Sequence, residues 1–245
     1  MIKFLRLRLG VGAAILIGVG LCCASGASAQ AQSDHPALEG VWKIAVPTAT
    51  LKPLDGAIPF TAKGRKEYDD NKKMKARGDY DDYDIATSRC SSPGVPRLML
   101  TPMRFKIWNR LGFVTFDFEW NRATRQIDLH ATKQPGLMGE DLVPNMTGDS
   151  RGHWEGDTLI ATTTNLSERT LLDDLLPHSV DMTVTERFRL TDPDTLEDRI
   201  TIDDPAYYMK RWDAVITYKR QPDAIFPEDV CLDRIKAHKP AFPGP

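Results

Sequence analysis

The sequence predicts an all-β fold, an antiparallel β-barrel with one surface helix near the N-terminus. Three patterns support this prediction. After about residue 100, short segments alternate between apolar and polar side chains, as strands with one buried face do. Turn-forming residues separate these segments at intervals of roughly 10 residues, which is typical of barrels and sandwiches. Only residues 60–78 combine helical composition with helix end signals.

The predicted strands follow one another along the chain with turns between them. Residues 113–120 are a clear example, because Val114, Phe116, Phe118 and Trp120 share one face while polar residues occupy the other. No internal repeat and no shift in composition marks a second domain. The predicted strands are residues 38–46, 103–108, 113–120, 125–131, 148–154, 158–166, 179–190, 196–203 and 211–220.

The predicted helix has a signal at each end. Thr61 is a suitable N-cap, and Gly78 can end the helix in a left-handed conformation. Its low apolar content places it on the barrel surface or across the barrel mouth. The acidic residues 79–84 that follow are interpreted as a solvated loop, and residues 89–97 as a rigid, proline-rich connection.

The N-terminus has the three parts of a secretory signal peptide. Lys3, Arg6 and Arg8 precede an apolar run, and the small residues Ala27–Ala29 form an A-x-A cleavage site. The apolar run is shorter than the roughly 20 residues that a spanning helix needs. We therefore expect residues 1–29 to be removed, leaving a single domain, 30–245, in the periplasm or outside the cell.

Composition excludes several classes of function. A formal net charge of −2 gives no general attraction to nucleic acid. No segment after the signal peptide is apolar enough to span a membrane, and no phosphate-binding glycine loop is present. The spacing of His130, His153 and His178 matches no compact metal motif. We expect neither a metal nor a cofactor.

Two cysteines remain after signal removal, Cys90 and Cys231. In an exported protein two cysteines usually form one disulfide, which predicts the pair Cys90–Cys231. Two free buried thiols are the alternative.

Several motifs resemble those of known proteins. Gly40-Val41-Trp42 on the first strand resembles the lipocalin signature, in which the tryptophan plugs the closed end of a barrel. Residues 152–159, Gly-His-Trp-Glu-Gly-Asp-Thr-Leu, resemble a motif of a family of exported bacterial proteins. Further matches are Pro177-His178-Ser179, residues 186–188, 192–195 and 203–205, and Cys231. The resemblance implies a lipocalin-like β-barrel and no particular activity, and His130 falls where the chain departs from the pattern.

Glu186 interrupts an otherwise apolar strand face. In residues 179–190, Val184 and Phe188 flank it on the same side. Burying an unpaired carboxylate is costly, so Glu186 must be paired or must face a wet cavity. In the first case an arginine such as Arg199 or Arg211 holds it. In the second it is a candidate general acid or base.

Asp198 interrupts the apolar face of the next strand in the same way, and pairing across residues 191–195 could bring it close to Glu186. Two carboxyl groups in one cavity can divide acid and base roles. An exposed position at the sheet edge is the alternative for Asp198. His153 and His130 are candidate proton-transfer partners, because histidine titrates near neutral pH, or they are surface residues.

These features support three functional hypotheses. The first is an exported protein that binds a small, largely apolar or aromatic molecule in a barrel cavity. The second is a cofactor-free lyase, isomerase or hydratase that uses Glu186 as acid or base, with His153 or Asp198 assisting. The third is a structural or interaction module of the cell envelope. The predicted ligand-contacting residues are Phe116, Phe118, Trp120, His130, Met182, Val184 and Phe188.

Overall fold

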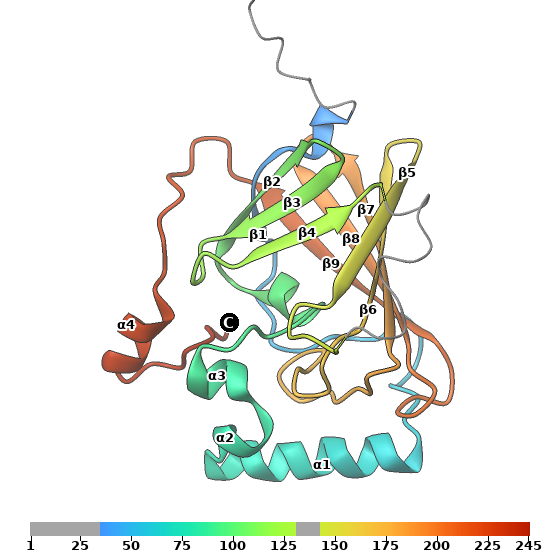
Figure 1. Ribbon diagram of the computed structural model, residues 1–245, viewed down its shortest axis with the longest axis vertical. Coiled ribbons are helices and arrows are strands. Elements are labelled where there is room, and N and C mark those ends of the chain that lie inside the picture. Colours follow the sequence, from blue (N-terminus) through green and yellow to red (C-terminus); the bar gives the residue numbers. More distant parts are fainter. Residues whose placement is uncertain (1–34, 131–142) are drawn as a thin grey trace, which may run out of the picture. The chain divides into compact units, whose positions relative to one another are not determined.

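In the computed structural model, which describes residues 35–130 and 143–245, nine strands form a closed barrel (Figure 1). The all-β prediction is confirmed. The predicted signal peptide, 1–29, lies outside the described residues. The strands are β1 (Gly40–Ile44), β2 (Arg104–Arg110), β3 (Phe113–Phe118), β4 (Thr124–Asp128), β5 (Asp149–Glu155), β6 (Thr158–Thr164), β7 (Thr183–Asp192), β8 (Thr195–Asp203) and β9 (Trp212–Arg220).

Neighbours in the barrel are neighbours in sequence, and β1 pairs with β9 to close it. Every pair is antiparallel except β4 and β5, which are parallel. The side chains of alternate residues point inward, so the apolar half of each strand fills the interior. The Phe105 ring packs against Phe116 and Phe118 with centroid distances of 5.8 and 5.4 Å, and Tyr218 meets Phe105 edge to face at 4.9 Å.

Trp42 is fully buried in the barrel core. Its indole Nε1 donates a hydrogen bond to Leu38 O at 3.0 Å. The Arg220 guanidinium lies 4.1 Å from the ring centroid and donates to Glu39 O and Ala37 O at 2.6 and 2.8 Å. This cation–π contact ties the start of the first strand to the end of the last.

Helix α1 (Ala62–Arg77) confirms the predicted helix and both of its caps. Thr61 accepts a hydrogen bond from Gly64 N at 3.1 Å, and Gly78 adopts the left-handed conformation with φ 79°. The helix lies at one end of the barrel (Figure 1). There it approaches the loop before β9 so closely that a Cβ at Gly64 would lie 2.2 Å from Tyr207 O. Only glycine fits this contact.

Residues 79–84 are not the predicted solvated loop. They form α2 (Tyr80–Tyr83), and α3 (Ile85–Arg89) follows. Tyr83 and Asp84 are buried. The Asp84 carboxylate accepts two hydrogen bonds from Arg97 at 2.6 and 2.8 Å. These bonds take the place of the hydrogen bonds to water that the carboxylate would make in an exposed loop.

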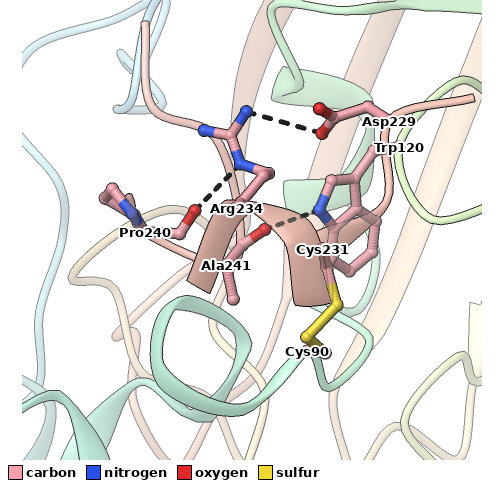
Figure 2. The surroundings of a disulfide bond; sticks show 7 residues. All are labelled: Cys90, Trp120, Asp229, Cys231, Arg234, Pro240 and Ala241. Atoms are coloured by element: carbon pink, nitrogen blue, oxygen red, sulfur yellow. Dashed lines mark hydrogen bonds and ion pairs between the residues drawn. A yellow bond between two sulfur atoms is a disulfide. The ribbon is translucent and has the colours of Figure 1, made fainter. Parts of the chain in front are cut away.

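Two short 3₁₀ helices and one α-helix complete the described structure: η1 (Pro36–Leu38), η2 (Arg97–Leu100) and α4 (Cys231–Lys236). The predicted disulfide Cys90–Cys231 is confirmed, and it joins the end of α3 to the start of α4 (Figure 2). No helix within the described residues is long and apolar enough to cross a membrane.

The segment after α4, residues 240–245, returns to the barrel and is here called the tail. Ala241 O accepts a hydrogen bond from the Trp120 indole at 2.8 Å (Figure 2). Ala241 N donates to Thr87 O at 2.9 Å. Arg234 Nε donates to Pro240 O at 2.9 Å. The disulfide and these bonds fix the tail beside α3.

Candidate functional site

Arg125 is the partner of Glu186 inside the barrel. Its guanidinium meets the Glu186 carboxylate with two nitrogens, and the Nη1–Oε1 distance is 2.9 Å. Both side chains are buried, at 2% and 0% exposure. Arg125 extends inward from β4, whereas Glu186 lies on β7. The pair therefore crosses the interior and joins two strands that are not neighbours.

Two hydroxyl groups complete the surroundings of Arg125. Its Nη2 donates to Thr163 Oγ1 at 3.1 Å and its Nε to Ser150 Oγ at 3.4 Å. Ser150 and Thr163 hydrogen-bond to each other at 2.7 Å. A buried ion pair is stabilised when its remaining donors find acceptors, which these hydroxyl groups provide.

Asp198 lies beside this pair, as the pairing across residues 191–195 predicted. Glu186 pairs with Ile200 and Phe188 pairs with Asp198, so the two carboxyl groups are diagonal neighbours on one face of the β7–β8 hairpin. Asp198 is fully buried, which rules out the exposed edge position. Burial, followed by the nearby Glu186 carboxylate, raises the pKa of Asp198 well above its usual range.

The surroundings of Asp198 favour its neutral form. Neither of its carboxyl oxygens accepts a hydrogen bond from any described residue. A neutral carboxyl group can donate its proton to the Glu186 carboxylate, whereas two ionised groups would repel each other. Arg125, Glu186 and a neutral Asp198 then carry no net charge. A substrate reaches neither carboxyl group unless the barrel opens, because both are fully buried.

The predicted histidine partners lie elsewhere. His153 is on the outer face of β5, 53% exposed, with its Nε2 3.1 Å from Glu155 Oε1. His130 follows β4, 64% exposed, with its Nδ1 3.2 Å from Asp128 Oδ1. The structure therefore brings Asp198, but neither histidine, to Glu186.

His178, the third histidine considered as a metal ligand, is buried and hydrogen-bonded to the Thr170 hydroxyl group and to Ser179 O, both at 2.8 Å. No group of three potential metal ligands gathers among the residues that the structure describes.

The predicted ligand-contacting residues other than His130 are all buried core residues. Phe116 packs on Phe188 with ring centroids 5.1 Å apart, and Val184 faces the same interior. Met182 precedes β7 in the core. The Trp120 indole is buried and donates a hydrogen bond to the tail at Ala241 O (Figure 2).

A cavity of about 290 Å³ lies where the tail meets α2, α3 and η2, and we call it the tail pocket. The tail contributes Pro240, Phe242, Pro243 and the last two residues to its wall. The rest of the lining comes from α2 and from segments far apart in sequence: Thr48, Ala49, Lys75, Tyr80, Tyr83, Asp84, Thr87, Arg97, Leu100 and Asp174.

The charged groups of the tail pocket occur in pairs of opposite sign. Asp84 pairs with Arg97, and Lys75 forms an ion pair with Asp174 Oδ2. The Arg97 guanidinium also lies 5.2 Å from the centroid of the Phe242 ring. The pocket therefore combines apolar and aromatic walls with a few fixed polar groups, which is the usual composition of a small-molecule site.

Sequence reasoning missed Arg125 and the tail pocket for different reasons. Arg125 shares its strand face with Ile127 in the predicted strand 125–131, and this alternation was a usable signal. Tyr80 and Tyr83 have the i, i+3 spacing of one helix face, a weaker signal for α2. The pocket itself had no signal in sequence, because residues from 48 to 245 converge on it.

No protein-family model matches the sequence, and no curated protein matches it significantly. The resemblance to exported proteins with the Gly-x-Trp-Glu-Gly-Asp-Thr-Leu motif stays a prediction.

Proposed function

We propose that the protein works outside the cytoplasm and binds a small, largely apolar or aromatic molecule, with the tail pocket as its site. The cavity at this place carries the proposal. Its volume of about 290 Å³ is close to the lower end of the range of roughly 300–1,000 Å³ typical of ligand sites. The interior side chains first expected to line a ligand cavity pack on one another instead.

The charges in the pocket support an uncharged ligand. Lys75 and Arg97 each have a carboxylate partner, so a charged ligand would have to displace one of these partners. The rings of Tyr80, Tyr83 and Phe242 offer flat apolar surfaces. Aromatic molecules pack favourably on such surfaces.

The disulfide and the N-terminal sequence support a location outside the cytoplasm. Disulfides persist in oxidising compartments and are rare in the cytosol. Residues 1–29 have the pattern of a signal peptide. The intact mass of the protein recovered from the periplasm or medium should correspond to a chain beginning at Gln30. Recovery of the uncleaved chain from the cytoplasm contradicts this part of the proposal.

The location of the binding site is tested by ligand titration, with a substitution that fills the pocket as the control. Naphthalene derivatives are titrated into the isotope-labelled protein while backbone amide shifts are recorded. We expect shifts at Tyr80, Thr87 and Leu100, which line the pocket. Ala49→Leu should abolish them, because Ala49 lines the pocket, whereas Ala57→Leu at an exposed loop position should not. Shifts that survive Ala49→Leu place binding elsewhere.

The filled barrel supports a second candidate, a structural or interaction module of the envelope. The buried Arg125–Glu186 pair gives the interior a structural rather than a catalytic role. Failure of every small molecule to shift the amides of the tail pocket would favour this candidate. Proton-transfer chemistry at Glu186 is the least supported, since Arg125 holds the carboxylate away from solvent.

A further inference from the structure

The middle of the tail is buried, although the chain before it is exposed. Residues 235–240 are exposed, residues 241–243 are buried, and the last two residues are exposed again. Ala241 is 0% exposed and Phe242 is 6% exposed. Chain ends are usually poorly ordered unless contacts hold them. Residues 241–243 are therefore docked on the folded body like a short bound peptide.

Both backbone polar groups of Ala241 are bound by other parts of the chain. Its carbonyl oxygen accepts a hydrogen bond from the Trp120 indole at 2.8 Å (Figure 2). Its N–H donates to the carbonyl oxygen of Thr87, on α3, at 2.9 Å. Backbone hydrogen bonds of this kind hold an extended peptide whatever its side chains are.

The side chains of the docked segment add specificity. The Phe242 ring meets the Trp120 ring edge to face at 5.1 Å, and the Arg97 guanidinium lies 5.2 Å from its centroid. Both kinds of contact favour an aromatic ring at this position. Pro240 and Pro243 flank the segment and favour an extended backbone, so less entropy is lost when it docks.

The groups that hold the tail, Thr87, Arg97 and Trp120, are here called the seat. Asp84 fixes two of them, because its carboxylate accepts from Arg97 at 2.6 and 2.8 Å and from Thr87 Oγ1 at 2.6 Å. A backbone bridge to Asp229 holds Trp120. None of these contacts involves residues 240–245, so the seat does not need the tail to keep its form. A preformed site of this kind favours binding.

We propose that the seat is a peptide-recognition site, which the tail occupies within its own chain. The partner that fits is an extended segment of another protein with a small residue, a phenylalanine and a proline in that order. The first residue must be small because Ala241 is fully buried, and the segment must be uncharged because Asp84 already neutralises Arg97.

The tail then competes with the partner for the seat. Only two residues follow Pro243, so the tail can leave without unfolding the barrel. This interaction goes beyond the proposed small-molecule function and does not depend on it. The seat holds a peptide whether or not a molecule occupies the cavity beside it.

The experiment vacates the seat and refills it. Phe242→Ala is made in the full exported protein, and the probe is the peptide Lys-Pro-Ala-Phe-Pro-Gly-Pro, the sequence of residues 239–245. The NMR signal of the Trp120 indole N–H reports the state of the seat. We expect this signal to move in Phe242→Ala and to return to its wild-type position as the peptide is added.

The wild type should bind the same peptide at least 10-fold more weakly than Phe242→Ala does. Its own tail is tethered close to the seat and competes at an effective concentration on the order of millimolar. Pro245→Ala, at the exposed end of the tail, is the matched control and should behave as the wild type.

A second peptide with alanine in place of the phenylalanine tests the role of the ring. It should bind Phe242→Ala about 10-fold more weakly, because it lacks the buried aromatic side chain. The amides of β7 and β8 should keep their wild-type shifts in Phe242→Ala, which shows that the barrel is intact. If they move, the milder Phe242→Leu takes its place.

Three outcomes overturn the proposal. If the peptide does not return the indole signal, the tail is a structural part of this chain and the seat recognises no other segment. If both peptides return it equally well, the phenylalanine is not recognised. If sedimentation shows a wild-type dimer that Phe242→Ala abolishes, the partner is the tail of a second copy rather than another protein.

Discussion

At the scale of single residues, the interior of the barrel places Arg125, Glu186 and Asp198 side by side. Arg125 and Glu186 neutralise each other, and burial beside Glu186 raises the pKa of Asp198 well above its usual range, which favours its neutral form. Such a group contributes little net stability when complete, because the desolvation of both ions offsets much of their attraction. Removing only one member of the ion pair is more destabilising, because the other charge then remains buried without a partner.

Arg125→Met should therefore destabilise the protein by about 3–5 kcal/mol, the usual effect of removing one member of a buried ion pair. Arg125→Met combined with Glu186→Gln should recover much of this loss, because no unpaired charge remains. Urea unfolding at pH 7 measures both variants. Equal losses in the single and double variants would show that the guanidinium acts through packing rather than charge.

Asp198 gives the protein a specific pH dependence. Its pKa in the folded state is raised, so between pH 4 and the folded pKa only the unfolded chain releases this proton. The wild type thus loses stability from this residue as pH rises, by up to about 1.4 kcal/mol per pH unit.

Asp198→Asn removes this decrease of stability with pH and keeps a neutral hydrogen-bond donor beside Glu186. Relative to the wild type, the variant should become more stable as pH rises from 4 to 7, as measured by urea unfolding at several pH values. The comparison between the variant and the wild type cancels the titration of groups that do not interact with Asp198. A difference in stability that is constant with pH would mean that Asp198 is ionised in the folded state.

At the scale of elements, the strands were predictable because alternation reports a buried face directly. Val114, Phe116 and Phe118 point inward as their spacing requires. The burial of Asp84, directly after α2, was not predictable in this way, because it depends on Arg97, which is 13 residues away and belongs to another element. Local patterns report which side of an element is buried, but not which distant residue meets it.

Helix α1 supplies a test of packing at this scale. Gly→Ala inside a helix normally stabilises by about 0.5–1 kcal/mol. Gly64→Ala should instead destabilise the protein by about 1–3 kcal/mol, because the new Cβ would lie 2.2 Å from Tyr207 O.

Thermal or urea unfolding measures the effect of Gly64→Ala. Lys72→Ala at an exposed position of the same helix is the control, and it should change stability by less than about 0.5 kcal/mol. A stabilising Gly64→Ala would show that α1 does not pack on the loop before β9 in solution.

At the scale of the whole molecule, one disulfide connects the helical end of the barrel to the C-terminal segment. Cys90 and Cys231 are separated by 141 positions in sequence, and the bond restricts the unfolded chain accordingly. Cys90→Ser/Cys231→Ser should lose about 2–5 kcal/mol of stability. The same loss should appear when the wild type is reduced, and reductant should not affect the double variant.

Amide hydrogen exchange shows which parts of the protein lose stability when the disulfide is removed. Exchange should accelerate at the amide of Ala241, which bonds to Thr87 O, and along α4. The paired amides of β7 and β8 should remain protected, because they lie in the closed barrel. Uniform acceleration throughout the protein would instead mean that tail and barrel unfold as one unit.

The pairing of β1 with β9 has a consequence for biosynthesis. The barrel cannot close until residues 212–220 have left the ribosome, since Arg220 and its strand complete the surroundings of Trp42. Contacts between such distant parts of a chain also form slowly. A nascent chain of this protein therefore lacks its final fold throughout most of translation. A chain that is still open is also one that a translocation channel can thread.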